Sequence, residues 1–599
     1  MALFEGIFLW AAFFATVAIA VWCAPRGFEF LDTGCYFLEY KWPEDVADTH
    51  TTYRLFARPF FLLVGESVTG FRLLSWAFVW LSAVVFGWGL LRHFQMLFPV
   101  ARFRWPVFVP LALLASAAVY TIKPAALTYN SLNFVAVCIA LGLFLSGVAR
   151  LIAAPSSPSW RGVVEIALAT AVATVDVLVK PTTAVYVLAC IGGYCAVCPA
   201  LPWQAKKRLG LVAVAAGGVG LVAMIVVVGG IGGFMTRVST LTSILQNRSF
   251  MEELNTRTVR EFGEIGTFLL GDLRHAAIAL GVGGLLVACL RRSETHARRA
   301  AAVVGGVAWA LWLYATVRAG LWRGSHGLYF EGIVARLYLG AALLTAAAAM
   351  VSWAVVPATW RQRGAVAKPL LKILVWVILM TVPFAGAYGS TTSVYLNGAL
   401  YSICWLAAAL LAVAEVMRVW GARLVFPAVA VPMAVYAVAQ LVHGQIIMPY
   451  MYPRPLWENT VPTAIGVKGG ELLVDPDTSQ VINTTRDILT RHGFKAGDDI
   501  FCFFNVPGLV YAVGGRSPVI PWYFGRIYVG NPVEEAHMQA AGPERRANAW
   551  IITQADVEQF REHFVRGGIN FPEGYEQIGT LKNHQSGLPL GIWKPRTRQ

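Results

Sequence analysis

Apolar stretches long enough to cross a membrane recur along the first three quarters of the chain, separated by polar loops. A helix that spans the hydrocarbon core of a bilayer needs about 20 mostly apolar residues, or about 17 at the short end. This pattern predicts about thirteen spanning helices with approximate ends, near 7–23, 71–91, 107–121, 132–149, 163–179, 182–201, 210–230, 275–290, 301–319, 334–356, 371–387, 398–417 and 424–442. The first stretch has neither a basic segment ahead of it nor a cleavage site of small residues, which favours a retained helix over a signal peptide.

The charges in the loops predict the orientation of these helices. Arginine and lysine gather in alternate loops, as at 102–104 and 206–208, whereas most loop acids lie in two long loops, 24–70 and 231–274. Cytoplasmic loops of membrane proteins carry an excess of arginine and lysine. We therefore expect the N-terminus in the cytoplasm and both acidic loops outside, and an odd number of spans places the C-terminus outside as well.

The composition changes near residue 443 to that of a water-soluble domain. Helical patterns then alternate with strand-like runs, with helices over 479–492 and 555–566 and strands near 500–504, 549–552, 577–580 and 590–593. Such alternation is typical of an α/β domain. The expected fold is a polytopic α-helical membrane protein, with a transmembrane domain over 1–442 and an extracytoplasmic α/β domain over 443–599.

Composition and charge narrow the class of protein further. The chain is 57% hydrophobic and 14% charged, against about 25% charged in soluble domains, so a single soluble core and a disordered chain are both excluded. The net charge of +15 is spread in small groups between apolar stretches, and a nucleic-acid partner is therefore not expected. We see neither a metal-binding motif nor a P-loop. No cofactor is expected; a divalent metal is compatible with the sequence, but nothing indicates one.

Asp32 is the first candidate for chemistry, because it follows the first predicted helix by a few residues, at the membrane surface. A carboxylate at that place can take a proton from a hydroxyl while the bilayer presents a lipid-borne group. The alternative is a structural aspartate that caps a short helix.

Two Lys-Pro pairs, Lys123-Pro124 and Lys180-Pro181, lie at the predicted outer interface. A lysine held there can neutralise a lipid phosphate, or it can cap the last carbonyls of a helix. Asp176, one turn before Lys180, is either a functional intramembrane acid or half of a structural pair. The polar run 128–133 suits either a sugar site or a turn, and the loop 231–274 either a mobile lid or an interfacial helix.

The architecture resembles that of the C-type glycosyltransferases, the GT-C superfamily, which includes aminoarabinose, mannosyl and arabinofuranosyl transferases. The run Asp-Thr-Gly-Cys-Tyr at 32–36 is similar to the acidic first-loop motif of these enzymes. The runs 180–183 and 507–516 are similar to elements of related membrane proteins and of their outer domains. Several members carry a second acid directly beside the first, whereas a threonine follows Asp32 here. The candidates for the second acid are Glu39, Glu44 and Asp45.

The resemblance implies an inverting transferase that moves a sugar from a polyprenyl-phosphate donor to an acceptor hydroxyl. The acceptor would be a cell-envelope glycan, lipid or protein at the outer, periplasmic face of a bacterial inner membrane. Asp32 would act as general base, and the leaving phosphate needs fixed positive charge. The candidates for that charge are Lys123, Lys180, Arg58 and Arg323, and those for binding the sugar are Tyr36, Trp42, Tyr53, Tyr129 and Asn130. The expected partners are the lipid-linked donor, the acceptor and the bilayer.

Two other functions remain open from the sequence. A transporter or flippase of lipids or lipid-linked glycans predicts polar residues deep in the spans and a repeat symmetry between the halves. A polymerase or ligase of surface glycans is the closer alternative, although such enzymes normally carry their large soluble region between spans.

Overall fold

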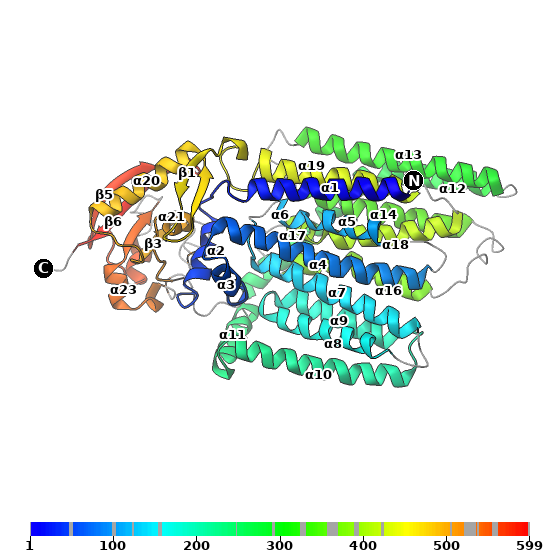
Figure 1. Ribbon diagram of the computed structural model, residues 1–599, viewed down its shortest axis with the longest axis horizontal. Coiled ribbons are helices and arrows are strands. Elements are labelled where there is room, and N and C mark those ends of the chain that lie inside the picture. The colour runs from blue at the N-terminus through cyan, green and yellow to red at the C-terminus, as the bar shows by residue number, and fades with distance from the viewer. Residues whose placement is uncertain are drawn as a thin grey trace. The chain divides into compact units, whose positions relative to one another are not determined.

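The computed structural model describes residues 2–46, 52–98, 104–121, 125–153, 159–246, 248–289, 294–323, 331–355, 369–388, 394–420, 425–503, 506–519, 521, 535, 538–553 and 561–596 (Figure 1). By its internal contacts the chain divides into two compact units. The first, here called the helical unit, comprises Met1–Val17, Phe78–Ile122 and Tyr129–Leu441. The second, called the mixed unit, comprises Ala18–Ala77, Lys123–Thr128 and Val442–Gln599.

Helices make up the described part of the chain up to residue 442, apart from short connections. Their bounds are α1 Ala2–Cys23, α2 Asp32–Lys41, α3 Tyr53–Leu63, α4 Val68–Leu97, α5 Trp105–Ser116, α6 Ala118–Thr121, α7 Tyr129–Ala153, α8 Trp160–Val175, η1 Asp176–Leu178, α9 Pro181–Val197, α10 Trp203–Val227, α11 Ile231–Gln246, α12 Arg248–Cys289, α13 Glu294–Arg323, α14 Glu331–Val355, α16 Pro369–Ala387, α17 Val394–Leu400, α18 Ser402–Trp420 and α19 Val425–Val442.

Eight helices among the described residues are long and apolar enough to cross a membrane. They are Glu5–Cys23, Val68–Leu97, Tyr129–Ala153, Trp203–Val227, Leu337–Ala354, Pro369–Ala387, Ser402–Trp420 and Phe426–Ile447. The remaining predicted spans also fall largely on helices, some of them short. The helical membrane-protein class is therefore supported, while the number of thirteen spans and their orientation stay predictions.

Small residues let the helices of the helical unit approach closely. Gly89 of α4 faces Gly142 of α7, and a Cβ at Gly89 would lie 1.9 Å from the Gly142 carbonyl oxygen. In the same way Gly147 of α7 faces Gly162 of α8. Figure 1 shows α7, α8, α9 and α10 side by side. Because lipid supplies no hydrophobic drive between helices, such close backbone contact is a main source of their packing energy.

The stretch 231–274, for which the sequence left a lid and an interfacial helix open, is helical wherever it is described. It comprises α11 and the first part of α12. The predicted span near 275–290 continues the same helix, because α12 runs unbroken for 42 residues.

The mixed unit contains a small sheet domain. After η3 (His443–Ile447) and η4 (Leu456–Glu458), its elements are β1 Val461–Ala464, β2 Glu471–Val474, α20 Pro476–Arg491, β3 Ile500–Phe503, α21 Pro507–Ala512, α23 Pro543–Asn548, β4 Trp550–Thr553, α24 Arg561–Arg566, β5 Tyr575–Lys582 and β6 Pro589–Pro595. The four predicted strands are confirmed as β3, β4, β5 and β6, and the first predicted helix as α20. The second predicted helix lies partly outside the described residues and ends in α24.

The strands form two sheets. The larger has the order β3-β4-β6-β5, with β3 and β4 parallel and the other neighbours antiparallel. Its buried core includes Phe501, Ile551, Phe564 and Phe571. The smaller is the antiparallel pair β1-β2.

The predicted first outer loop packs with the C-terminal part of the chain inside the mixed unit. Helix α2 lies against α21, where a Cβ at Gly34 would come within 1.9 Å of Gly508 Cα. The Gly27 N–H donates to the Leu473 carbonyl over 2.8 Å, which adds the chain after α1 to β2. The units divide between Leu441 and Val442, beside the predicted boundary at 442–443. Residues 18–77, which the prediction placed in the transmembrane domain, belong by their contacts to the mixed unit with the tail.

Candidate functional site

Asp32, Cys35 and Glu39 follow one another along one face of α2. Their spacing of three and four residues places them on neighbouring turns. Asp32 is 4% exposed and Glu39 is 6% exposed, so the mixed unit buries both carboxyl groups. Burial and the charges of Glu39 and Asp32 raise the pKa of the Cys35 thiol well above its usual value. Buried carboxyl groups so close together are uncommon unless they serve a site or are firmly bonded.

Glu29, which the sequence did not single out, caps the start of this helix. Its fully buried carboxylate accepts hydrogen bonds from the backbone N–H groups of Leu31, over 2.5 Å, and Thr33. Burial and the charge of Asp32 raise the pKa of Glu29 to about 7, against the opposing effect of the bonds from Thr33 and Leu31. Glu29 and Asp32 thus form an interacting carboxyl pair, in which burial and the neighbouring charge favour a proton on Glu29.

Glu39 is held at the other end of the same face. It accepts a hydrogen bond from the Tyr53 hydroxyl, and the Cys35 Sγ lies 3.5 Å from its Oε1. Burial raises the pKa of Glu39, while the Arg54 charge and the bond from Tyr53 act in the opposite direction. These contacts join α2 to α3.

Asp45 and Glu44 take part in an ion-pair network. Arg516 donates to both Asp45 oxygens, at 2.5 and 2.7 Å, and Arg545 donates to Asp45 Oδ1 at 2.8 Å. Arg545 also binds Asp499. Glu44 is exposed and lies 3.8 Å from Arg58 and 3.5 Å from Arg516. In this arrangement Asp45 ties the chain after α2 to the sheet domain, and Arg58 faces a carboxylate.

The aromatic candidates of the first loop lie around the same helices. The Tyr36 and Tyr53 rings meet edge to face with centroids 5.8 Å apart. The Arg516 guanidinium lies 4.7 Å from the Trp42 ring. Tyr53 is buried, and Tyr36 and Trp42 are partly exposed, so these last two offer ring surface for a sugar.

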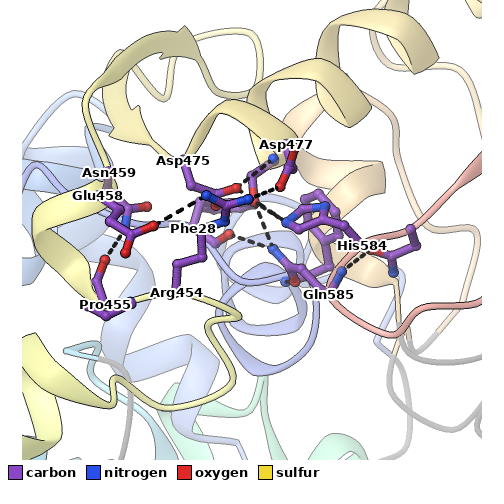
Figure 2. Close-up of polar contacts among 12 residues, drawn as sticks. Phe28, Arg454, Pro455, Glu458, Asn459, Asp475, Asp477, His584 and Gln585 are labelled. Carbon is purple, nitrogen blue, oxygen red and sulfur yellow. Dashed lines mark hydrogen bonds and ion pairs between the residues drawn. The ribbon is translucent and has the colours of Figure 1, made fainter.

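Gln585 and the start of α20 support the segment that leads to Asp32. Gln585 accepts a hydrogen bond from Phe30 N–H over 3.1 Å and donates to the Phe28 carbonyl over 3.2 Å. Figure 2 shows Asp475 and His584 beside this contact. Asp475 accepts from the N–H of Thr478 over 3.0 Å and so caps α20. Burial acts to raise the pKa of Asp475, but the bonds from His584 and Thr478 outweigh it and hold that pKa at about 2.

A second polar cluster lies in the helical unit. Pro181 begins α9, and the preceding Lys180 donates to Asn130 Oδ1 over 2.9 Å and to the Gly386 carbonyl. The Lys180 Nζ also lies 5.6 Å from the Tyr129 ring. The sequence candidates Lys180, Tyr129 and Asn130 are therefore brought together.

Asp176 extends this cluster with Asn133, the last residue of the polar run 128–133, and with Tyr401, which the sequence did not indicate. Asn133 donates to Asp176 Oδ2 over 2.5 Å, and its own oxygen accepts from the Tyr401 hydroxyl. The other Asp176 oxygen has no hydrogen-bond partner among the described residues. Asn133 stands one turn beyond Asn130 on α7, and that spacing was a usable signal, whereas nothing local marks Tyr401.

The remaining candidates cannot be placed. Lys123 lies outside the described residues, and so does the side chain of Arg323 at the end of α13. Within the described ranges no group of three or more His, Cys, Asp and Glu side chains is positioned to hold a metal ion.

Comparison of the chain with protein-family models, with curated proteins and with solved structures finds no match.

Proposed function

We propose that the chain is a membrane glycosyltransferase that moves a sugar from a polyprenyl-phosphate donor to an acceptor hydroxyl. The observation that carries the proposal is the buried carboxyl pair Glu29–Asp32, at the start of the first helix after α1. A transferase of this kind needs a general base close to the surface of the bilayer that holds its donor. The chain offers such a group where the first candidate span ends.

Asp32 is the proposed base. The acceptor oxygen bonds to the anomeric carbon of the sugar while the bond from that carbon to the phosphate oxygen breaks. The acceptor proton passes to Asp32, and polyprenyl phosphate leaves. Because two adjacent carboxyl groups resist double ionisation, a proton on Glu29 leaves the charge on Asp32, where a base requires it. Attack from the side opposite the phosphate inverts the anomeric centre.

The test uses purified full-length protein in liposomes with a panel of polyprenyl-phosphate sugars and candidate acceptors. Release of free polyprenyl phosphate is measured for the wild type, for Asp32→Asn and for the exposed control Asp477→Asn. We expect release to fall at least ~100-fold in Asp32→Asn, as for loss of a general base, and to be unchanged in the control. If Asp32→Asn releases polyprenyl phosphate as fast as the wild type does, Asp32 is not the general base.

A transporter of lipids or lipid-linked glycans is the second candidate, favoured by the buried cluster of Asp176, Asn133 and Tyr401. Polar groups inside a helical membrane domain often mark a transport path. The same liposomes distinguish the two. Movement of a labelled lipid across the bilayer without release of sugar would support transport and contradict the transferase.

A further inference from the structure

The mixed unit contains a small, partly open cavity beside two arginines. Its volume is about 30 Å³, and its lining includes Cys23, Arg26, Arg72, Trp76, Gln445 and Tyr452. A space of about 10–15 Å³ on this measure holds one water molecule. The cavity itself therefore holds about two water molecules, and a larger group such as a phosphate can lie only at its mouth.

Arg72 brings a buried positive charge to this cavity. It is 5% exposed, and its guanidinium donates to the carbonyls of Ala24, Arg26 and Gly27 at 2.9–3.0 Å. A longer contact of 3.4 Å reaches the Tyr452 hydroxyl. All four acceptors are neutral groups. They take up the N–H donors of both terminal nitrogens, so Arg72 offers the cavity its positive charge and not those donors.

Arg26 adds a second charge at the same place. Its guanidinium donates to the Trp22 carbonyl and lies 4.2 Å from the Trp22 ring. In the part of the chain that the structure describes, no carboxylate forms an ion pair with Arg26 or with Arg72. Because an unpaired charge is costly to hold away from water, the buried Arg72 beside the partly exposed Arg26 indicates an anionic ligand.

The position of the arginines indicates which anion. Arg26 follows the end of one candidate span, Glu5–Cys23, and Arg72 lies in the first turns of another, Val68–Leu97. Trp22, which is exposed, stands beside Arg26, and tryptophan favours the boundary between lipid and water. The phosphate groups of membrane lipids lie in this layer, where basic side chains bind them.

We propose that Arg26 binds the phosphate group of a membrane lipid at this cavity, and that the charge of the buried Arg72 beside it strengthens the binding. The binding of a lipid phosphate does not depend on the proposed function. The further step, that this lipid is the polyprenyl phosphate released from the sugar donor, rests on the proposed function. Arg26 precedes Asp32 by six residues, so their backbones lie at most about 20 Å apart. The mixed unit thus carries the proposed base and a phosphate-binding site on one short segment.

The test measures binding to full-length protein in phosphatidylcholine nanodiscs. The ligands are a short-chain prenyl phosphate, the matching prenyl alcohol and inorganic phosphate. The variants are Arg26→Gln, Arg72→Lys and the control Arg454→Gln, an exposed arginine of the same unit that pairs with Asp477. We expect Arg26→Gln to weaken prenyl phosphate binding at least ~10-fold, which is about 1.4 kcal/mol, and Arg454→Gln to leave it unchanged.

Three outcomes would overturn the proposal: no binding of prenyl phosphate to the wild type, equal binding of the alcohol, or unchanged binding in Arg26→Gln. If inorganic phosphate binds as tightly as prenyl phosphate, the ligand of the site is a free anion and the lipid is excluded. If Arg72→Lys fails to fold, Arg26→Gln still decides, because Arg26 is partly exposed. This binding test contains no sugar, so it is independent of the liposome assay for sugar transfer. If prenyl phosphate binds here but the liposome assay shows no transfer, the binding site stands and only the proposed function is contradicted.

Discussion

Gly34 of α2 and Gly508 of α21 lie so close together that neither position has room for a side chain. A Cβ at Gly34 would lie 1.9 Å from Gly508 Cα, and one at Gly508 would lie 2.5 Å from Phe30 Cα. The Gly508 N–H also donates to the Phe30 carbonyl over 2.7 Å. This backbone contact joins the helix that begins with Asp32 to the C-terminal part of the chain. The placement of Asp32 therefore depends on a residue far along the sequence.

Gly508→Ala tests this contact. The added methyl group forces α2 and α21 apart, and we expect the free energy of unfolding of the mixed unit to fall by about 1–3 kcal/mol, as for other overpacked sites. Denaturant titration followed by circular dichroism measures the change. Gly193→Ala is the control, because a Cβ at this position of α9 meets no atom within 4 Å. Wild-type stability in Gly508→Ala would contradict the close packing.

Glu29→Gln tests the raised pKa of the helix cap. The pKa of Glu29 is about 7 in the folded protein, above its ordinary 4.5. The folded state therefore holds the proton more tightly, and this contribution to stability is complete below pH 4.5 and lost as the pH rises through 7. The difference corresponds to about 3 kcal/mol. We expect Glu29→Gln to flatten unfolding free energies measured from pH 4.5 to 8, and the exposed Glu576→Gln to keep the slope.

Asp45 and Arg516 form a pair suited to a double-mutant cycle. Asp45 is 4% exposed at its side chain and meets Arg516 through two hydrogen bonds. We expect Asp45→Asn and Arg516→Gln to show a coupling energy of about 1–3 kcal/mol in unfolding experiments. The exposed pair Arg454 and Asp477 should show less than about 0.5 kcal/mol. Equal coupling in the two cycles would show that burial does not strengthen the first pair.

Asp475→Ala removes the cap of α20 (Figure 2). We expect the mixed unit to lose about 1–2 kcal/mol, the usual effect of deleting such a cap. Asp477→Ala, two residues further on, removes only an exposed carboxylate and should change stability by less than about 0.5 kcal/mol. Because the pKa of Asp475 is held at about 2, below its ordinary 3.8, its contribution should persist above pH 3.8 and disappear as the pH falls towards 2. A thermal scan series from pH 2 to 5 measures both effects.

The elements of the fold that the sequence predicts are those with a local signal. Long apolar stretches predicted α4, α7 and α18, and short strand-like runs predicted β3 and β6. In each case the pattern reflects burial along one element, which neighbouring residues determine. The helices inside 24–70 were harder to foresee, because their buried faces carry charged residues such as Asp32, Glu39 and Arg54.

The candidate site depends mainly on contacts between distant residues. Asp45 was a candidate acid by its place in the loop, but its partner Arg516 lies 471 residues away. Lys180 meets the Gly386 carbonyl across 206 residues, and a backbone acceptor has no signature in a sequence. Glu29 was not predicted either, although it carried a local signal, because a carboxylate just ahead of a helix start is a recognisable cap.

The pairing of residues 25–27 with β2 limits the order in which this protein can fold during its synthesis. Gly27 and Pro25 find their partner Leu473 about 450 residues later in the chain, which a ribosome reaches roughly 20–90 s after making them. Until then the segment around Glu29 and Asp32 has no β2 strand to join. The segment that carries the acidic pair can therefore complete this pairing only after Leu473 is made, and a chain cut before Leu473 lacks it.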